Sequence, residues 1–144
     1  MIALDTNLLV YAHRNDSPFH DAAKSAVDGL VGSGAVWALP WPCLHEFISV
    51  VTSARIFKQP TPLASAFEVL RAMTDSPHAR LLAEGPGYLQ ILQRCALAAR
   101  LAGPAIHDAR IAALCLHHGV RELWSADRDF SRFHELKVRN PLRE

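Results

Sequence analysis

Two aspartates follow short apolar segments that are typical of β-strands. Asp5 comes directly after residues 2–4, and Asp127 comes after residues 120–124 and a two-residue turn. Ligands of open parallel sheets bind beyond the carboxyl ends of the strands. If these two strands are parallel, both carboxylates therefore lie at the same edge of one sheet.

Asp108 stands in the first turn of a helix predicted over residues 105–118, where the helix dipole favours an acid. Its neighbours at helical spacing are Ile111, Ala112 and Cys115, all apolar. The carboxylate of Asp108 therefore lies on or beside the buried face of the helix. A carboxylate in that position needs a partner.

Glu46 falls in a helix predicted over residues 43–53. It shares a side of that helix with Ser49 and Ser53, whereas the apolar residues group on another side. Periodicity alone therefore predicts that Glu46 is exposed to solvent.

Taken singly, these acids have structural explanations: Asp5 can cap a helix, and Asp127 and Asp129 can stabilise a turn. Taken together they suggest a metal site, since hard divalent cations such as Mg²⁺ and Mn²⁺ prefer carboxylate and water ligands. Two carboxylates about 6 Å apart repel by roughly 3 kcal/mol at an effective dielectric near 20. A cluster of four is stable only if a cation neutralises it or some of the carboxyl groups are protonated.

Short strands that alternate with helices predict an α/β fold with a mostly parallel sheet. The predicted strands are residues 2–4, 35–39, 78–83, 120–124 and 136–138. The predicted helices are residues 8–13, 17–31, 43–53, 61–73, 85–101 and 105–118. No repeat, low-complexity stretch or long linker divides the chain, so residues 1–144 are expected to form a single domain.

Composition narrows the class of protein. Half of the 144 residues are apolar, enough for a core at this length. A net charge of +1 excludes a polybasic protein held to its partner by bulk charge, but not a local basic rim. The chain has three cysteines, an odd number, and no C-x-x-C motif. A disulfide scaffold and a cysteine zinc ribbon therefore do not fit this sequence. With no signal-peptide pattern and no run of about 20 apolar residues, we expect a cytoplasmic protein without membrane association.

The ordered set of motifs resembles the signature of the PIN domain, and the whole chain is similar to the VapC-type toxins of bacterial toxin–antitoxin pairs. Each motif is weak alone, but the set in this order is specific. The matching residues are Asp5-Thr6-Asn7, Glu46, Asp108-Ala109-Arg110-Ile111-Ala112-Ala113 and Ser125-Ala126-Asp127-Arg128-Asp129-Phe130. Ser125 stands where threonine is commoner, a change that keeps the hydroxyl group.

This resemblance implies a PIN-like three-layer sandwich, in which a sheet of about five strands lies between helices. It also implies that Asp5, Glu46, Asp108 and Asp127 meet in one acidic pocket and hold Mg²⁺ or Mn²⁺. Asp129 matches a further acid at the edge of the pocket. Thr6 (or Asn7) and Ser125 match polar positions that orient the acids or contact metal-bound water.

The implied activity is that of a metal-dependent endoribonuclease, the toxin of a type II toxin–antitoxin system, which cleaves RNA with metal-activated water. The implied partners are RNA, a second copy of the chain and an antitoxin whose C-terminal segment covers the pocket. RNA binding needs positive charge around the negative pocket. The candidates from the sequence are Arg14, Arg55, Lys58, Arg110, Arg128 and Arg132.

Two alternatives remain open at this point. The His20-Asp21 and His107-Asp108 pairs also suit a His-Asp metal phosphohydrolase, a class with all-α folds, although the predicted strands argue against it. A catalytically inactive PIN-like binding module is the other alternative. Residues next to the site acids, such as His45 and His107, point about 100° away on a helix, so we expect them to be supporting or surface residues. The segment 36–42, rich in Trp and Pro, suits either packing or a local surface for a partner or substrate, and packing is favoured.

Overall fold

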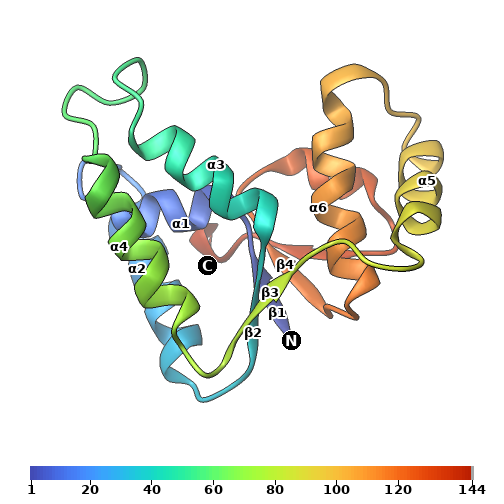
Figure 1. The fold of residues 1–144 in the computed structure, drawn as a ribbon, viewed down its shortest axis with the longest axis horizontal. Helices are drawn as coiled ribbons and strands as arrows, with labels where there is room; N and C mark the ends of the chain where they lie inside the picture. Colours follow the sequence, from blue (N-terminus) through green and yellow to red (C-terminus); the bar gives the residue numbers. More distant parts are fainter. Residues whose placement is uncertain (144) are drawn as a thin grey trace.

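The computed structural model describes residues 1–143 and contains one five-stranded parallel sheet (Figure 1). The strand order is β3-β2-β1-β4-β5, and every pair of neighbours is parallel. The strands are β1 (Ile2–Leu4), β2 (Trp37–Pro40), β3 (Ala79–Leu82), β4 (Glu122–Trp124) and β5 (Lys137–Arg139). The predicted α/β architecture with a parallel sheet is therefore confirmed, and the all-α alternative is wrong.

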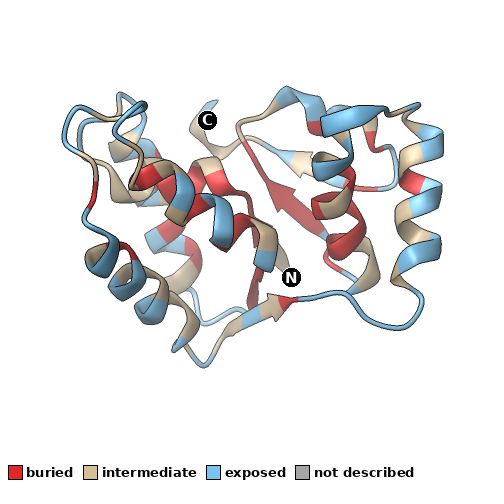
Figure 2. Ribbon diagram, turned by 45° about the horizontal axis from the view of Figure 1, so that its top comes forward, coloured by how far each residue is buried: buried red, intermediate tan, exposed pale blue. Residues whose placement is uncertain are grey.

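Helices cover both faces of the sheet, as a parallel sheet requires (Figure 1). One face packs against α1 (Thr6–His13), α2 (His20–Gly32), α3 (Trp41–Val51) and α4 (Leu63–Thr74). The other face packs against α5 (Tyr88–Ala98) and α6 (Ile106–His117). Short 3₁₀ helices occupy Gly103–Ala105, Arg128–Arg132 and Pro141–Arg143. Buried residues gather on the central strands β1, β2 and β4 and on the inner helix faces, whereas the edge strands β3 and β5 are mostly intermediate or exposed (Figure 2).

Alternation along β1 separates the two cores. Leu4 belongs to the cluster beneath α1 to α4, whereas Ala3 belongs to the cluster beneath α6. The small side chain of Ala3 shares its cluster with Ala109 and Ala112 of α6, all fully buried. Small residues on both elements let the helix lie close to the sheet. That close packing fixes where the first turn of α6 lies.

The sheet has its topological switch point at β1, because the chain adds β2 on one side and β4 on the other. The crevice beyond the carboxyl ends of these strands is the place where ligands bind in open α/β sheets. The backbone N–H of Asp5 donates to the carbonyl oxygen of Trp124 at 3.0 Å, which joins the ends of β1 and β4. β1 and β4 are parallel, which meets the condition under which the sequence places Asp5 and Asp127 at the same edge of the sheet, and they are also direct neighbours.

Most element boundaries match the predicted ranges closely, and three boundaries differ by three residues. Helix α5 begins at Tyr88 rather than residue 85, because Gly87 before it adopts a left-handed conformation (φ +90°). Helix α2 begins at His20 rather than residue 17, because the Ser17 hydroxyl accepts from the backbone N–H of Phe19 in a turn. Helix α5 ends at Ala98, three residues before the predicted end, because Arg100 adopts a left-handed conformation (φ +54°). Such a residue ends a helix.

The cysteine prediction is confirmed: all three cysteines are free and buried. Trp37, in the segment rich in Trp and Pro, is fully buried and serves packing as expected, but Trp41 is 38% exposed. Within residues 1–143, none of the helices is long and apolar enough to cross a membrane.

Substitution of Phe47, on α3, tests how well the core beneath α1 to α4 is packed. Its side chain is fully buried among the residues beneath α1 to α4. We expect Phe47→Ala to lower the free energy of unfolding by about 3–5 kcal/mol, because it leaves a cavity that the sheet cannot fill. Leu97→Ala on α5 is the control, since Leu97 is 69% exposed. Denaturant unfolding that shows equal effects for the two variants would contradict this assignment of the core.

Candidate active site

All four acids singled out in the sequence line one cavity of about 590 Å³ at the switch point of the sheet. Asp5 follows β1, Glu46 lies on α3, Asp108 lies in the first turn of α6, and Asp127 follows β4. The structure therefore brings these four residues together from elements that are far apart in the sequence.

Asp5 is held by several donors around its buried carboxylate. Its Oδ1 accepts from the backbone N–H of Thr6 at 2.8 Å and from the Cys43 thiol at 3.6 Å. Its Oδ2 accepts from the Ser125 hydroxyl at 2.6 Å and from the Asn7 side-chain amide at 3.3 Å. The side chain thus caps α1, and the network fixes its orientation.

Ser125 links the ends of β1 and β4. Its hydroxyl donates to Asp5 and accepts from the backbone N–H of Asp127 at 3.0 Å and from the Asn7 amide at 3.4 Å. A hydroxyl has one donor and two acceptor sites, so all of them are used. The Asn7 side-chain oxygen also accepts from the backbone N–H of Ala126 at 3.2 Å. Threonine would offer the same hydroxyl, so Ser125 preserves the chemistry of that position.

Glu46 is exposed, as its helical position predicts, and it also lines the cavity. Its Oε2 accepts from the Thr6 hydroxyl at 3.0 Å, a bond between α1 and α3. Thr6 therefore orients one acid through its backbone N–H and a second acid through its hydroxyl.

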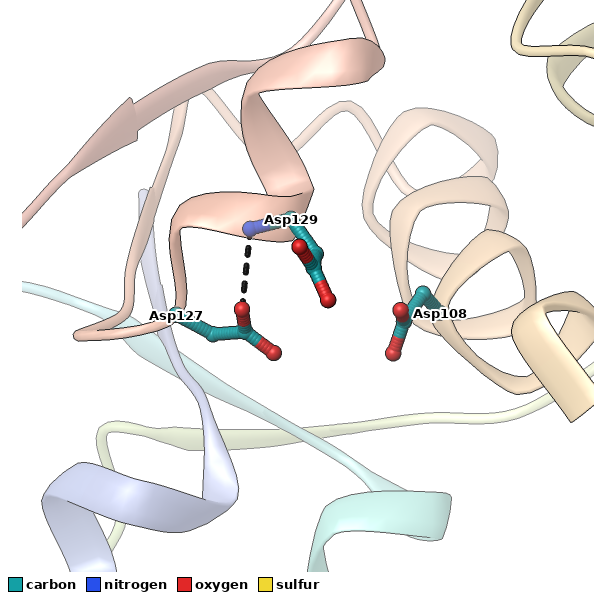
Figure 3. A group of neighbouring side chains, drawn as sticks. All are labelled: Asp108, Asp127 and Asp129. Atoms are coloured by element: carbon teal, nitrogen blue, oxygen red, sulfur yellow. Dashed lines mark hydrogen bonds between the residues drawn. The ribbon is translucent and has the colours of Figure 1, made fainter.

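Three aspartates form the tightest acidic group at the site. Asp108, Asp127 and Asp129 each offer a carboxylate oxygen within 4.8 Å of the others (Figure 3). The Asp127 Oδ1 accepts from the backbone N–H of Asp129 at 2.8 Å, which caps the 3₁₀ turn that begins at Arg128. At such a separation, two carboxylates repel by about 3 kcal/mol at an effective dielectric near 20.

Arg132 offsets part of this repulsion. Its Nη2 lies 3.3 Å from the Asp108 Oδ2 and 3.6 Å from the Asp129 Oδ2. Its Nε donates to the backbone carbonyl of Asp129 at 2.9 Å. The partner that the sequence required for Asp108 is therefore an arginine from the 3₁₀ turn after β4.

The positive charge near the acids does not balance their negative charge. The pKa of Asp5 is raised to about 6, mainly because its carboxyl group is buried. The hydrogen bonds from Ser125 and Thr6 lower this pKa, and the nearby charge of Glu46 raises it further. The pKa of Asp108 is also raised, first by burial and then by the charge of Asp127, against the lowering effect of Arg132. Ionised carboxylates in this cavity therefore need more positive charge than Arg132 supplies.

The donor set fits a hard divalent cation. In residues 1–143, the one group of His, Cys, Asp or Glu close enough to share an ion consists of Asp108, Asp127 and Asp129. All of its ligand atoms are carboxylate oxygens, which suit Mg²⁺ and Mn²⁺ better than softer ions. The raised pKa values of Asp5 and Asp108 are those of acids that a bound cation would stabilise in the charged form.

The basic residues suggested by the sequence do not all lie at the cavity. Of the six candidates, only Lys58 lines it. Arg14 pairs with Asp16 at 2.6 Å and lies over the Phe57 ring, and Arg110 pairs with Glu84 at 3.1 Å. Arg55 and Arg128 are exposed and form no ion pair within residues 1–143. Arg132, as described above, contacts the acids themselves.

Sequence reasoning missed two features of the site. Cys43 looked like an ordinary core residue, but its thiol contacts Asp5. The cavity also extends from the acids to an apolar part that includes Phe19 and Ile56, which are 47% and 58% exposed. Neither residue belongs to a motif, and no signal in the sequence marks them as neighbours of the acids.

Comparison with known proteins gives the class of the protein. Residues 2–136 match the family model of the PIN domain. The chain therefore belongs to the PIN domain family, as its motifs indicated.

Among curated relatives, the chain is 36% identical to Ribonuclease VapC48 of Mycobacterium tuberculosis, over 96% of this chain and 95% of that protein. It is 35% identical to Ribonuclease VapC31 of the same organism, over 99% of this chain and 100% of that protein. Among solved structures, VapBC2 from Rickettsia felis, bound to a DNA fragment from its promoter, is similar with a TM-score of 0.71 at 16% identity, over 97% of this chain and 98% of that chain. These likenesses confirm the PIN-like three-layer fold.

The raised pKa of Asp5 predicts a dependence of stability on pH in metal-free protein. Between about pH 4 and pH 6 the folded state holds a proton that the unfolded chain has released, so the free energy of unfolding falls as the pH rises through this range and levels off above about pH 6. A shift of about two units corresponds to about 3 kcal/mol. Asp5→Asn removes this titration and should make the fall shallower than in wild type.

Denaturant unfolding in the presence of a chelator measures this effect at each pH. Asp75→Asn, at an exposed position after α4, is the control and should follow wild type. If the free energy of unfolding of the Asp5→Asn protein falls with pH as steeply as that of wild type, Asp5 does not titrate in this range.

Proposed function

We propose that this protein is a metal-dependent endoribonuclease and the toxin of a type II toxin–antitoxin pair. The observation that carries the proposal is the convergence of Asp5, Glu46, Asp108 and Asp127 in one cavity of a PIN domain. The curated relatives over the whole length are named ribonucleases, which supports RNA as the substrate.

We assign Asp5, Asp108 and Asp127 as the residues that hold one Mg²⁺ or Mn²⁺, with Glu46 completing the set. Asp129 forms the tight group with Asp108 and Asp127, to which Asp5 and Glu46 do not belong, and we assign it a supporting role beside the cation. When bound, such a cation supplies a Lewis acid that lowers the pKa of water and offsets charge on the phosphate.

The protein's own residues keep the acids in place for this role. Ser125, Asn7 and the Thr6 backbone fix the Asp5 carboxylate, and the Thr6 hydroxyl holds Oε2 of Glu46. Glu46 is thereby oriented to complete the set that holds the cation. Water attacks the phosphorus atom and the bond to the 3′ oxygen breaks. The proton that the water loses passes through solvent to the 3′ oxygen, so the products carry a 5′-phosphate and a 3′-hydroxyl group.

An antitoxin partner is supported by the solved structures, which include VapBC2 from Rickettsia felis and VapBC-1 from nontypeable Haemophilus influenzae. The exposed Phe19 and Ile56 in the apolar part of the cavity suit a partner segment that covers the acids. Homodimer formation and a cytoplasmic location remain predictions. The exposed Leu63 and Phe67 on α4 are candidates for contacts between copies.

Metal binding distinguishes this proposal from an inactive binding module. We expect calorimetry to detect Mn²⁺ binding by wild-type protein, and Asp108→Asn to weaken it at least about tenfold, because the substitution removes one charged ligand from the tight group. Asp75→Asn should bind Mn²⁺ as wild type does. Folded wild-type protein that binds no Mn²⁺ would favour the inactive module.

Cleavage is the direct test of the proposed activity. We expect Asp5→Asn and Asp108→Asn each to lower RNA cleavage by about 100-fold or more while the protein stays folded, because each keeps the shape and removes a charge. Sequencing of RNA ends after brief induction in cells, with Asp5→Asn and Asp75→Asn as controls, gives both the cut positions and the end groups. Full activity of Asp5→Asn would refute the mechanism.

A further inference from the structure

A second cleft, between α3 and α6, lies on the other side of two site acids. It has a volume of about 460 Å³, and Glu46 and Asp108 line both this cleft and the acidic cavity. We call it the α3–α6 cleft. A chain that runs from one space into the other passes the residues that line both, Glu46, Asp108 and Ile111.

The other polar side chains of the α3–α6 cleft include donors to anions. His45 and Ser49 come from α3, and His107 and Arg110 come from α6. The ion pair of Arg110 with Glu84 uses the Nε group at 3.1 Å. A guanidinium carries five N–H donors, so Arg110 can also donate to a phosphate.

The acidic cavity carries the larger excess of negative charge. Its charged lining consists of five acids, Asp5, Asp16, Glu46, Asp108 and Asp127, and a single basic residue, Lys58. In the α3–α6 cleft, the charged lining is Arg110 and the two shared acids, Glu46 and Asp108, and two imidazoles and a hydroxyl are further donors. The smaller excess of acids and the larger number of donors thus favour this cleft as the path of the flanking backbone.

Trp41 adds a surface for stacking beside this cleft. It is the first residue of α3 and is 38% exposed, and its ring centroid lies 6.0 Å from that of His45. Proteins that bind single-stranded RNA stack bases on exposed aromatic side chains. The other two tryptophans, Trp37 and Trp124, are buried, so Trp41 is the tryptophan that a ligand can reach.

A second metal site is a poor explanation for the two histidines. Within residues 1–143, the group that could share an ion contains Asp108, Asp127 and Asp129 but neither His45 nor His107. The histidines are exposed on the cleft wall, which suits contacts to a polar ligand from solvent.

We propose that the α3–α6 cleft binds the single-stranded RNA that adjoins the scissile phosphate on one side. Arg110, His45 and His107 donate to backbone phosphates, and Trp41 stacks on a base. The inference rests on the proposed function for the position of the scissile phosphate, but the binding can be tested without cleavage.

The first test measures binding of a single-stranded oligouridylate by fluorescence anisotropy, with Asp5→Asn protein so that the RNA stays intact. Adding Arg110→Gln should weaken binding about tenfold and reduce the slope of log affinity against log salt by about 0.7, the value for one lost phosphate contact on a single strand. Arg71→Gln, an exposed residue of α4 that lines neither space, is the matched control and should change neither quantity.

The second test uses tryptophan fluorescence. Stacking of a base on Trp41 should quench the emission of the Asp5→Asn protein as oligouridylate is added, and Trp41→Phe should abolish most of this quenching. Thermal unfolding confirms that each variant is folded.

Three outcomes would overturn the proposal: no binding of oligouridylate, an Arg110→Gln protein with unchanged affinity and salt slope, or quenching that survives Trp41→Phe. Cleavage by wild-type protein is scored separately. Binding through the cleft by a protein that cleaves no RNA would refute the proposed function and leave the cleft assignment standing. If the wild-type protein cleaves RNA but the Arg110→Gln variant binds oligouridylate normally, the cleft assignment is refuted and the proposed function stands.

Discussion

Mutual repulsion among carboxylates is the constraint on which the active site depends. Asp108, Asp127 and Asp129 present oxygens within 4.8 Å of one another, and burial and neighbouring charge raise the pKa of Asp5 and Asp108. Such a cluster costs stability in the free protein. Under the proposed function, a bound divalent cation would relieve this repulsion.

Hydrogen bonds from neutral donors hold Asp5 and Asp127, whereas Arg132 contacts the carboxylates of Asp108 and Asp129. Ser125 joins Asp5 to the backbone of Asp127, and Asn7 ties both loops together. Arg132 is the one arginine that contacts the tight group within the described residues. Because neutral donors supply most of the contacts, the acids keep their orientation without losing their need for a cation.

Helices α3 and α6 carry residues that line both the acidic cavity and the α3–α6 cleft. Alanines on β1 and α6 allow close packing, which places Asp108 over the ends of the strands. The same two helices carry Glu46, the histidines and Arg110 on their outer sides. One pair of elements therefore separates an acidic cavity from a cleft rich in donors, and a nucleic-acid strand that crosses between them passes Glu46 and Asp108.

The sequence by itself determined the elements and the identity of the acids. Strand ends fixed the place of Asp5 and Asp127, and periodicity correctly predicted an exposed Glu46 and a half-buried Asp108, because both signals depend on local geometry. Three contacts were decided only by the tertiary structure. The Thr6 hydroxyl donates a hydrogen bond to Glu46, Arg132 forms an ion pair with Asp108, and the Cys43 thiol contacts Asp5. These contacts join residues from 24 to 40 positions apart. Their geometry is set by how helices pack across the sheet, which no local pattern encodes.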